Sequence, residues 1–306
     1  GVMVAFLSYV NRFFQPIQEL SRIYTTFQSA MAGGEQVVEL LDTPLEIIEK
    51  PGAPELLPQN GEIRVTGVSF RYNPDSAEVL HDIHMVIPAG KTAALVGPTG
   101  AGKTTIANLI ARFYDTTAGS ITIDGVDIRD VTINSLRRQV CVISQDPFLF
   151  SRSIAENIRF GNPAATDEEV RQAARLANAH DFIARLPEGY NTRVLEGGVN
   201  LSQGQRQLLS IARALLTNPA VLILDEATAN IDSVTEALVQ DAIARMLKGR
   251  TAMVIAHRLS TVRNADLVFV IAEGKIVEQG THNSLLKKNG LYRQLYERQF
   301  MDEPGT

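Results

Sequence analysis

Residues 97–105 read GPTGAGKTT and directly follow the apolar run TAALV at 92–96. Glycine adopts left-handed backbone torsions without a steric penalty, so closely spaced glycines indicate a tightly turned loop. The pattern G-x-x-x-x-G-K-[ST] is matched by Gly97, Gly102, Lys103 and Thr104. Between a strand at 92–96 and a helix at about 103–113, such a loop binds phosphates, with Lys103 on the β- and γ-phosphates and Thr104 on Mg²⁺. The stretch therefore predicts a nucleoside triphosphate site.

A second apolar run, AVLILDE at 220–226, ends in two carboxylates. In P-loop proteins a buried strand places an acidic side chain in the magnesium shell, which predicts that Asp225 helps to bind Mg²⁺. Glu226, one residue later, is placed to orient and deprotonate a water molecule. The guanine-reading pattern N-K-x-D does not occur in the sequence, which disfavours a GTPase.

The segment NLSQGQRQLLSIARALL at 200–216 indicates a second phosphate-binding element. Ser202 and Gln205 form the S-x-x-Q pattern of a capping box, so a helix is expected to begin at this point. Capping explains how the helix starts, but not why it lies just upstream of Asp225. A capped helix N-terminus that carries Ser and Gly also favours phosphate binding, which implies two nucleotides or one shared nucleotide.

Composition narrows the possible partners and compartments. The net charge of −5 argues against a nonspecific nucleic-acid-binding protein, which normally carries an excess of basic side chains. Cys141 is the single cysteine, so an internal disulfide is impossible and a reducing compartment fits. The opening GVMVAFLSYV has no basic leader, so no signal peptide is expected, and it is shorter than the about 20 apolar residues of a membrane span.

Residues 1–48 are expected to form a helix with one apolar seam. The seam steps alternately by four and three residues through Phe6, Val10, Phe13, Ile17, Leu20, Tyr24, Phe27 and Met31. Pro16 should bend this helix, and Gly33-Gly34 should loosen it before a short helix that stops at Thr43-Pro44. The pattern alone fits a coiled-coil or docking helix and the cytoplasmic end of a transmembrane helix equally well.

The motifs together resemble those of the nucleotide-binding domain of ATP-binding cassette (ABC) transporters, specifically exporter-type half-transporters. GPTGAGKT is similar to the Walker A loop, VLILDE to Walker B, LSQGQ to the signature motif and ANID to the D-loop. These motifs recur in the family's order over essentially the whole chain. Gln203 stands where the usual signature motif has its first glycine.

The resemblance implies an α/β fold: a P-loop NTPase (RecA-like) core with an antiparallel β subdomain and an α-helical subdomain. Residues 1–48 would be the C-terminal end of a transmembrane domain, and the Pro- and Gly-rich segment 49–60 a linker. The nucleotide-binding domain would occupy 61–306, with antiparallel strands within 61–90 and the helical subdomain at about 146–217.

The resemblance also implies a role for each motif residue. ATP would be bound by Tyr72, which stacks on adenine, and by Gly97, Pro98, Thr99, Gly100, Ala101, Gly102, Lys103, Thr104 and Thr105. The catalytic residues would be Glu226, the switch histidine His257 and the Q-loop glutamine Gln145. The magnesium ligands would be Thr104, Gln145 and Asp225. A second subunit's nucleotide would be contacted by Ser202, Gln203, Gly204 and Gln205, with Asp232 in the D-loop.

The expected function is that of an ABC exporter's ATPase, which binds ATP and Mg²⁺ and powers transport through ATP-driven dimerisation. The implied partners are a second nucleotide-binding domain, identical or different, and the transmembrane domains at the cytoplasmic face of the cell (inner) membrane, with no nucleic acid. A soluble ABC ATPase that is not coupled to transport is the alternative, which the acidic balance and the apolar amino-terminal helix disfavour. Two other classes are also disfavoured. The ATPase subunit of an importer would begin near the first β-strand, without a helix ahead of it, and a P-loop kinase would lack LSQGQ.

Overall fold

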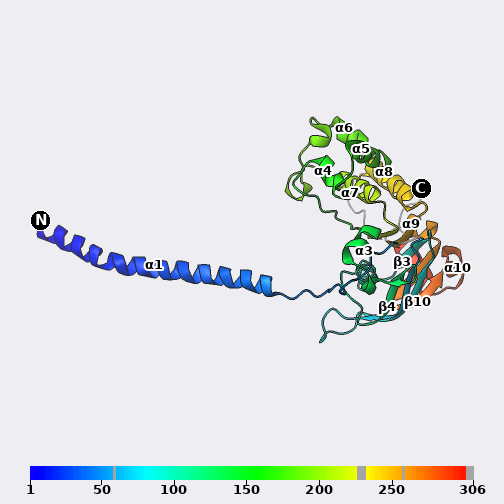
Figure 1. Ribbon diagram of the computed structural model, residues 1–306, viewed down its shortest axis with the longest axis horizontal. Coiled ribbons are helices and arrows are strands. Elements are labelled where there is room, and N and C mark those ends of the chain that lie inside the picture. Colours follow the sequence, from blue (N-terminus) through cyan, green and yellow to red (C-terminus); the bar gives the residue numbers. More distant parts are fainter. Residues whose placement is uncertain (58–59, 226–231, 257–258, 301–306) are drawn as a thin grey trace. The chain divides into compact units, whose positions relative to one another are not determined.

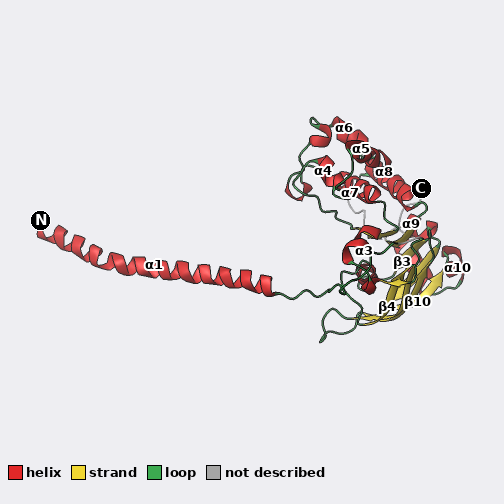
Figure 2. Ribbon diagram, in the orientation of Figure 1, coloured by secondary structure: helices red, strands yellow, loops and turns green. Residues whose placement is uncertain are grey.

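The computed structural model describes residues 1–57, 60–225, 232–256 and 259–300. It forms two compact units, Gly1–Ile48 and Glu49–Thr306. Figure 1 labels their elements along the chain, and Figure 2 distinguishes helices from strands.

The first unit consists of one long helix, α1 (Val2–Asp42), none of whose residues is buried. The helix continues through Gly33-Gly34, so the expectation of a separate short helix after these glycines is wrong. Each glycine weakens a helix by only about 1 kcal/mol, and the flanking residues are good helix formers. The helix ends where expected, because Thr43 is extended ahead of Pro44. Within the described ranges, no helix combines the length and apolarity needed to cross a membrane.

The second unit is built on a six-stranded sheet in the order β10-β9-β3-β8-β7-β6. Its strands are β3 (Thr92–Val96), β6 (Val140–Ile143), β7 (Val221–Asp225), β8 (Thr251–Ile255), β9 (Leu267–Ala272) and β10 (Lys275–Gly280). All neighbours pair in parallel except β9 and β10. The central strands are almost wholly buried, as expected of parallel strands covered on both faces.

A four-stranded antiparallel sheet, in the order β2-β1-β4-β5, forms the β subdomain. Its strands are β1 (Ile63–Phe70), β2 (Leu80–Ile87), β4 (Ala118–Ile123) and β5 (Val126–Asp127). The expected appendage within 61–90 thus gains two further strands from beyond the P-loop. Asp124 and Gly125 join β4 to β5 with left-handed torsions (φ 49° and 82°), as a type I′ hairpin turn requires.

Helices cover the parallel sheet and form the helical subdomain. The α-helices are α2 (Lys103–Ile110), α3 (Ile133–Gln139), α4 (Ile154–Arg159), α5 (Asp167–Leu176), α6 (His180–Arg185), α7 (Gln203–Thr217), α8 (Ser233–Leu247), α9 (Leu259–Asn264), α10 (His282–Lys287) and α11 (Leu291–Phe300). Short 3₁₀ turns are η1 (Ile128–Asp130), η2 (Gly189–Asn191) and η3 (Glu196–Gly198). Helices α4 to α7 fall within the expected insert and gather away from β4 and β10 (Figure 2).

The core lies on both faces of the parallel sheet. Alternate residues of β7 point to opposite faces, so Val221 and Ile223 join the cluster shared with the antiparallel sheet and α2. Leu222 and Leu224 join the cluster shared with the helical subdomain. The sheet is therefore packed on both faces, and the motif loops extend from the ends of its strands.

Candidate nucleotide-binding site

The P-loop and Asp225 lie at one edge of the parallel sheet. Leu95 of β3 pairs with Ile255 of β8, which in turn pairs with Asp225 of β7. The P-loop therefore starts two residues beyond a position that is level with Asp225. Ligands of open parallel sheets bind beyond the carboxyl ends of the strands, so this edge is the expected place for a nucleotide.

Close packing requires the glycines of the P-loop. A Cβ on Gly97 would lie 2.1 Å from the carbonyl oxygen of Ile271, and one on Gly102 would lie 2.6 Å from Cδ2 of Leu80. Gly100 and Gly102 also adopt left-handed torsions, with φ of 81° and 103°. A side chain at Gly97 would therefore collide with the backbone of β9, whereas the left-handed torsions at Gly100 and Gly102 favour glycine.

Lys103 lies inside the loop that it follows. Its Nζ donates hydrogen bonds to the carbonyl oxygens of Gly97 and Pro98 at 2.8 and 2.9 Å. Burial lowers the pKa of Lys103, and the nearby negative charge of Asp225 partly offsets that effect. A cation is therefore held at the point where the loop would receive phosphate.

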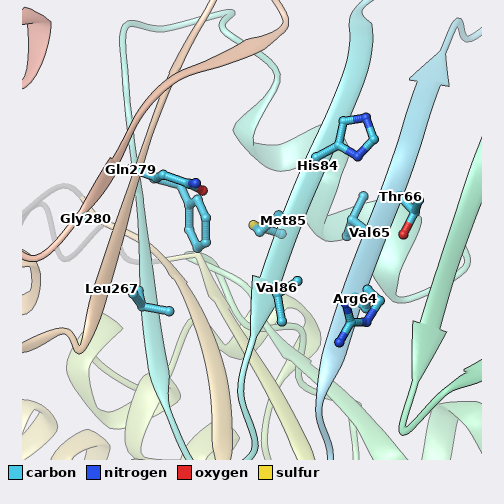
Figure 3. Close-up of a pocket in the computed structure, with 10 residues that line it drawn as sticks. Arg64, Val65, Thr66, His84, Met85, Val86, Leu267, Gln279 and Gly280 are labelled. Atoms are coloured by element: carbon cyan, nitrogen blue, oxygen red, sulfur yellow. The ribbon is translucent and has the colours of Figure 1, made fainter.

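A pocket of about 300 Å³ opens at the loop and is lined by Val79, Thr99, Gly100, Gly102, Lys103, Thr104, Thr105 and Ile255. A larger depression of about 670 Å³ lies between the antiparallel sheet and β9–β10, lined by residues that include Arg64, His84 and Gln279 (Figure 3). The larger one contains none of the predicted site residues, whereas the P-loop pocket contains six of them, from Thr99 to Thr105. The chemistry therefore favours the smaller pocket.

Tyr72, predicted to receive the adenine, lies beside the P-loop helix. Its hydroxyl shares a hydrogen bond of 3.0 Å with Oγ1 of Thr105. Thr105 is buried, whereas the Tyr72 side chain is exposed. Two residues that were predicted separately, one for the base and one for the phosphates, are thus in direct contact.

Gln145 follows β6, whose last residue, Ile143, pairs with Leu224 next to Asp225. The Gln145 side chain is exposed, and the backbone carbonyl oxygen of Gln145 accepts a hydrogen bond from Nε2 of Gln207 at 3.3 Å. Arg206, also in α7, lies 3.7 Å from the carboxylate of Asp146. Sequence reasoning missed Arg206 and Gln207, because no spacing signal links them to residues about 60 positions earlier.

The predicted capping box at the start of α7 is confirmed. Gln205 N donates to Oγ of Ser202 at 3.2 Å, and Oε1 of Gln205 accepts from Ser202 N at 2.9 Å. Gln203 is half-buried and Gly204 is buried. Among the described residues of this single chain, no hydrogen bond joins 202–205 to the P-loop.

Asp232 is the N-cap of α8, where its side chain accepts a hydrogen bond from Thr235 N at 3.0 Å. This bond holds the pKa of Asp232 below its usual range. The two predicted catalytic residues Glu226 and His257 lie outside the described residues. Their strands, β7 and β8, end at Asp225 and Ile255 at the same sheet edge.

A family profile and similar curated relatives assign this chain to the same family. The profile of the ABC transporter family matches residues 80–229. The ABC transporter ATP-binding protein YknV of Bacillus subtilis (strain 168) is 50% identical over 300 residues, which are 98% of this chain and 50% of that protein. The ATP-dependent lipid A-core flippase of Syntrophus aciditrophicus (strain SB) is 46% identical over 303 residues, which are 99% of this chain and 50% of the flippase.

A solved structure gives the same result for the fold. The structure of a bacterial Atm1-family ABC exporter with ATP bound has a TM-score of 0.82 and 40% sequence identity to this chain. The match covers 97% of this chain and 52% of the exporter. The chain thus spans about half the length of the relatives that it matches. It belongs to the ABC transporter family, and the proteins that it resembles over about half of their length include an exporter.

Proposed function

We propose that this chain is the ATP-hydrolysing portion of an ABC exporter and that ATP-driven dimerisation of its second unit powers transport. The observation that carries the proposal is the meeting of the P-loop, Asp225 and the Gln145 segment at one sheet edge. The Atm1-family relative supports the coupling to export, because its match extends over α1 as well as the ATP-binding domain.

The nucleotide would lie along the P-loop, with its base against Tyr72 and its phosphates on residues 97–105. The hydrogen bond between Tyr72 and Thr105 links the residue proposed to bind the base to the loop proposed to bind the phosphates. Lys103 supplies positive charge for the β- and γ-phosphates, and the N-terminus of α2 supplies backbone N–H donors. Stacking of a base on an aromatic ring contributes about 1–3 kcal/mol.

The donor chemistry of this edge fits Mg²⁺. Asp225 offers a carboxylate and Thr104 an exposed hydroxyl, with the Gln145 amide as a third oxygen ligand. Within the described part of the chain, no group of three or more His, Cys, Asp or Glu side chains could hold a metal by itself. Mg²⁺ usually binds to one or two carboxylates together with substrate phosphates. The single carboxylate of Asp225, with the Thr104 hydroxyl and the Gln145 amide, agrees with that pattern. When bound, the ion would neutralise phosphate charge.

Hydrolysis would follow the pattern of other P-loop enzymes. Glu226 would accept a proton from the water, whose oxygen forms a bond to the γ-phosphorus while the bond to the β–γ bridging oxygen breaks in line and ADP leaves. Gln145 would help to position that water. His257 donates a hydrogen bond to the γ-phosphate and stabilises the charge that develops there. In the sequence, Glu226, Gln145 and His257 follow the carboxyl ends of β7, β6 and β8, respectively.

A second nucleotide-binding domain would complete each site in a head-to-tail dimer. The capped N-terminus of α7, with Ser202 and Gly204, would contact the γ-phosphate held by the other subunit, and Asp232 would lie in the D-loop between them. Gln203 and Gln205 flank this contact. The partner is an identical or a different subunit, and α1 would be the end of the last transmembrane helix at the cytoplasmic face of the inner membrane.

The decisive experiment is the variant Glu226→Gln, which keeps hydrogen bonding but cannot accept a proton. A positioned base contributes about 10²- to 10⁴-fold in rate, so hydrolysis should fall while ATP still binds. Size-exclusion chromatography should show a dimer with MgATP but a monomer with MgADP, and adding Ser202→Arg should abolish the dimer. A Glu226→Gln protein that binds ATP yet stays monomeric, also with its natural partner present, would refute the shared site.

A further inference from the structure

The Tyr72 ring is held by two other aromatic rings that no nucleotide motif contains. The ring centroids of Phe70 and Tyr72 are 4.9 Å apart, and those of Tyr72 and Tyr114 are 5.1 Å apart. Both pairs are edge-to-face, with interplanar angles of 82° and 89°. Phe70 and Tyr114 also contact each other at 5.7 Å, so the three rings form a closed cluster.

The members of this cluster differ in exposure. Phe70 is 3% exposed and belongs to the core, whereas the Tyr72 side chain keeps 44% of its surface exposed. Tyr114 lies between these extremes and packs against the same core. Tyr72 is thus an exposed ring on a buried aromatic base, with its hydroxyl fixed by Thr105.

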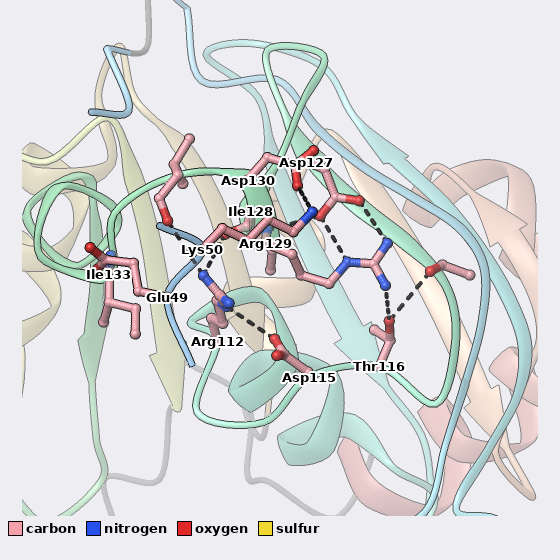
Figure 4. Close-up of polar contacts among 12 residues, drawn as sticks. Glu49, Lys50, Arg112, Asp115, Thr116, Asp127, Ile128, Arg129, Asp130 and Ile133 are labelled. Carbon is pink, nitrogen blue, oxygen red and sulfur yellow. Dashed lines mark hydrogen bonds and ion pairs between the residues drawn. The ribbon is translucent and has the colours of Figure 1, made fainter. Parts of the chain in front are cut away.

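The turn that carries Tyr114 is anchored by a buried charge. Arg112 is 1% exposed and adopts a left-handed torsion (φ 52°), which ends the P-loop helix region two residues before Tyr114. Its guanidinium donates to the carboxylate of Asp115 at 3.0 Å and to the carbonyl oxygen of Ile128 at 3.1 Å (Figure 4). Because a buried guanidinium requires these partners, the turn has little freedom to move.

The same turn is bonded to the strand that leads to Tyr72. Thr117 N donates to the carbonyl oxygen of Ser69 at 3.0 Å, and Arg71 N donates to Oγ1 of Thr117 at 3.2 Å. Tyr72 and Tyr114 therefore extend from two backbone segments that are joined to each other as well as to the core.

From these contacts we infer that Tyr114 is a positioning residue for the nucleotide base, acting by holding the Tyr72 ring in the orientation that receives adenine. The inference rests on the proposed role of Tyr72. Without the Tyr114 ring, Tyr72 would keep its contacts with Phe70 and Thr105 but would gain rotational freedom, which base binding must then remove. Rigid aromatic platforms bind more tightly because less side-chain freedom is lost.

The test compares two probes on the whole chain by titration calorimetry with Mg²⁺ present: ATP, and tripolyphosphate, which has the phosphates but no base. Tyr114→Leu should weaken ATP binding about two- to tenfold, the range of an edge-to-face aromatic pair, and leave tripolyphosphate binding unchanged. Tyr114→Phe keeps the ring and should bind ATP like the wild type. Tyr190→Leu, which removes another partly buried tyrosine, should change neither affinity and controls for general destabilisation.

A double-mutant cycle supplies the second readout. In a Tyr72→Leu background, Tyr114→Leu should cause no further loss of ATP affinity, because there is no ring left to orient. Equal losses for both probes, additive losses in the cycle, or a wild-type ATP affinity in Tyr114→Leu would each overturn the inference. If Tyr72→Leu itself leaves ATP affinity unchanged, the proposed base site fails and the role of Tyr114 fails with it.

Discussion

Lys103 holds its ammonium 2.8 Å from the carbonyl oxygen of Gly97, six residues earlier in the chain. This contact places the ammonium group at the centre of the P-loop, among backbone dipoles. Burial lowers the pKa of Lys103 there. A buried charge weakens the fold unless its hydrogen bonds offset the cost of desolvation. An anionic ligand therefore explains the position of Lys103 better than a contribution to stability does. Binding and stability should therefore respond differently to its removal.

The first prediction is that Lys103→Met separates ATP binding from folding. Loss of a charge-assisted contact of about 1.5–3 kcal/mol should weaken ATP binding about 10- to 100-fold, while the melting temperature stays the same or rises. Calorimetry and thermal unfolding measure the two effects. Lys91→Met, at the other end of β3 where Lys91 pairs with Asp266, is the matched control and should leave ATP affinity intact. Unchanged ATP affinity in Lys103→Met would contradict the proposal that the P-loop binds the phosphates of ATP.

The second prediction separates the two roles of Ser202. Ser202→Ala loses the cap of α7 and should lower the free energy of unfolding by about 1 kcal/mol. Ser202→Asp should keep the cap, because Asp caps about as well as Ser, but its charge repels phosphate. In the Glu226→Gln background, Ser202→Asp should therefore be stable and fail to dimerise with MgATP.

Thr281 provides the control for this substitution, because it caps α10 in the same way, with Ser284 as the third helical residue. Thr281→Asp adds the same charge away from the nucleotide edge and should leave MgATP-driven dimerisation intact. Loss of the dimer in both variants would mean that net charge, rather than the α7 terminus, controls association.

The third prediction concerns the segment that follows α1. Residues after Ile48 are bonded to the α3 region: Ile133 N donates to Glu49, Thr132 N to the carbonyl oxygen of Pro54, and Leu56 N to Oγ of Ser135. Lys50 also pairs with Asp130 (Figure 4). Because α1 has no buried residue, deleting 1–48 should improve solubility and preserve ATP affinity and the melting temperature.

Deleting 1–56 provides the contrast to this truncation. It also removes the buried Leu56 and the three backbone contacts, and so should lower the free energy of unfolding by at least about 2 kcal/mol. Urea denaturation of the two truncated proteins measures the difference. Equal stabilities would show that residues 49–56 do not belong to the folded core, and unfolding of both would make α1 essential to it.

The fourth prediction is a pH dependence at α10. Burial, with the charge of Arg263 as a further cause, lowers the pKa of His282, whose Nδ1 lies 2.6 Å from the hydroxyl of the buried Tyr292. The unfolded chain then binds more protons than the folded chain near the ordinary histidine pKa, so stability falls as the pH drops through that region. Comparing urea denaturation at pH 7.5 and 5.5, His282→Gln should lose less stability than the wild type. Parallel pH profiles would contradict this linkage.

Local rules were enough to predict the elements that carry the motifs. The strand at 92–96 and the helix that Ser202 caps occur as expected, because an apolar run and a capping box act within a few residues. The prediction for α2 was less accurate: the helix ends at Ile110 rather than near 113. Arg112 adopts its left-handed torsion because its guanidinium bonds to carbonyl groups 16 and 19 residues later, which no local pattern encodes.

By itself, the sequence determined the family, the phosphate-binding loop and the strand that ends at Asp225, since each depends on residue types at short, regular spacing. Only the tertiary structure decided which residues meet: Tyr72 with Thr105 and Tyr114, and Gln207 with the Gln145 segment. The residues of each pair lie 33 to 62 positions apart in the sequence. No local spacing rule predicts such contacts, because they depend on how the sheets and helices pack against one another. The motifs therefore predict which residues bind the nucleotide, whereas the contacts that position those residues depend on the packing of the core.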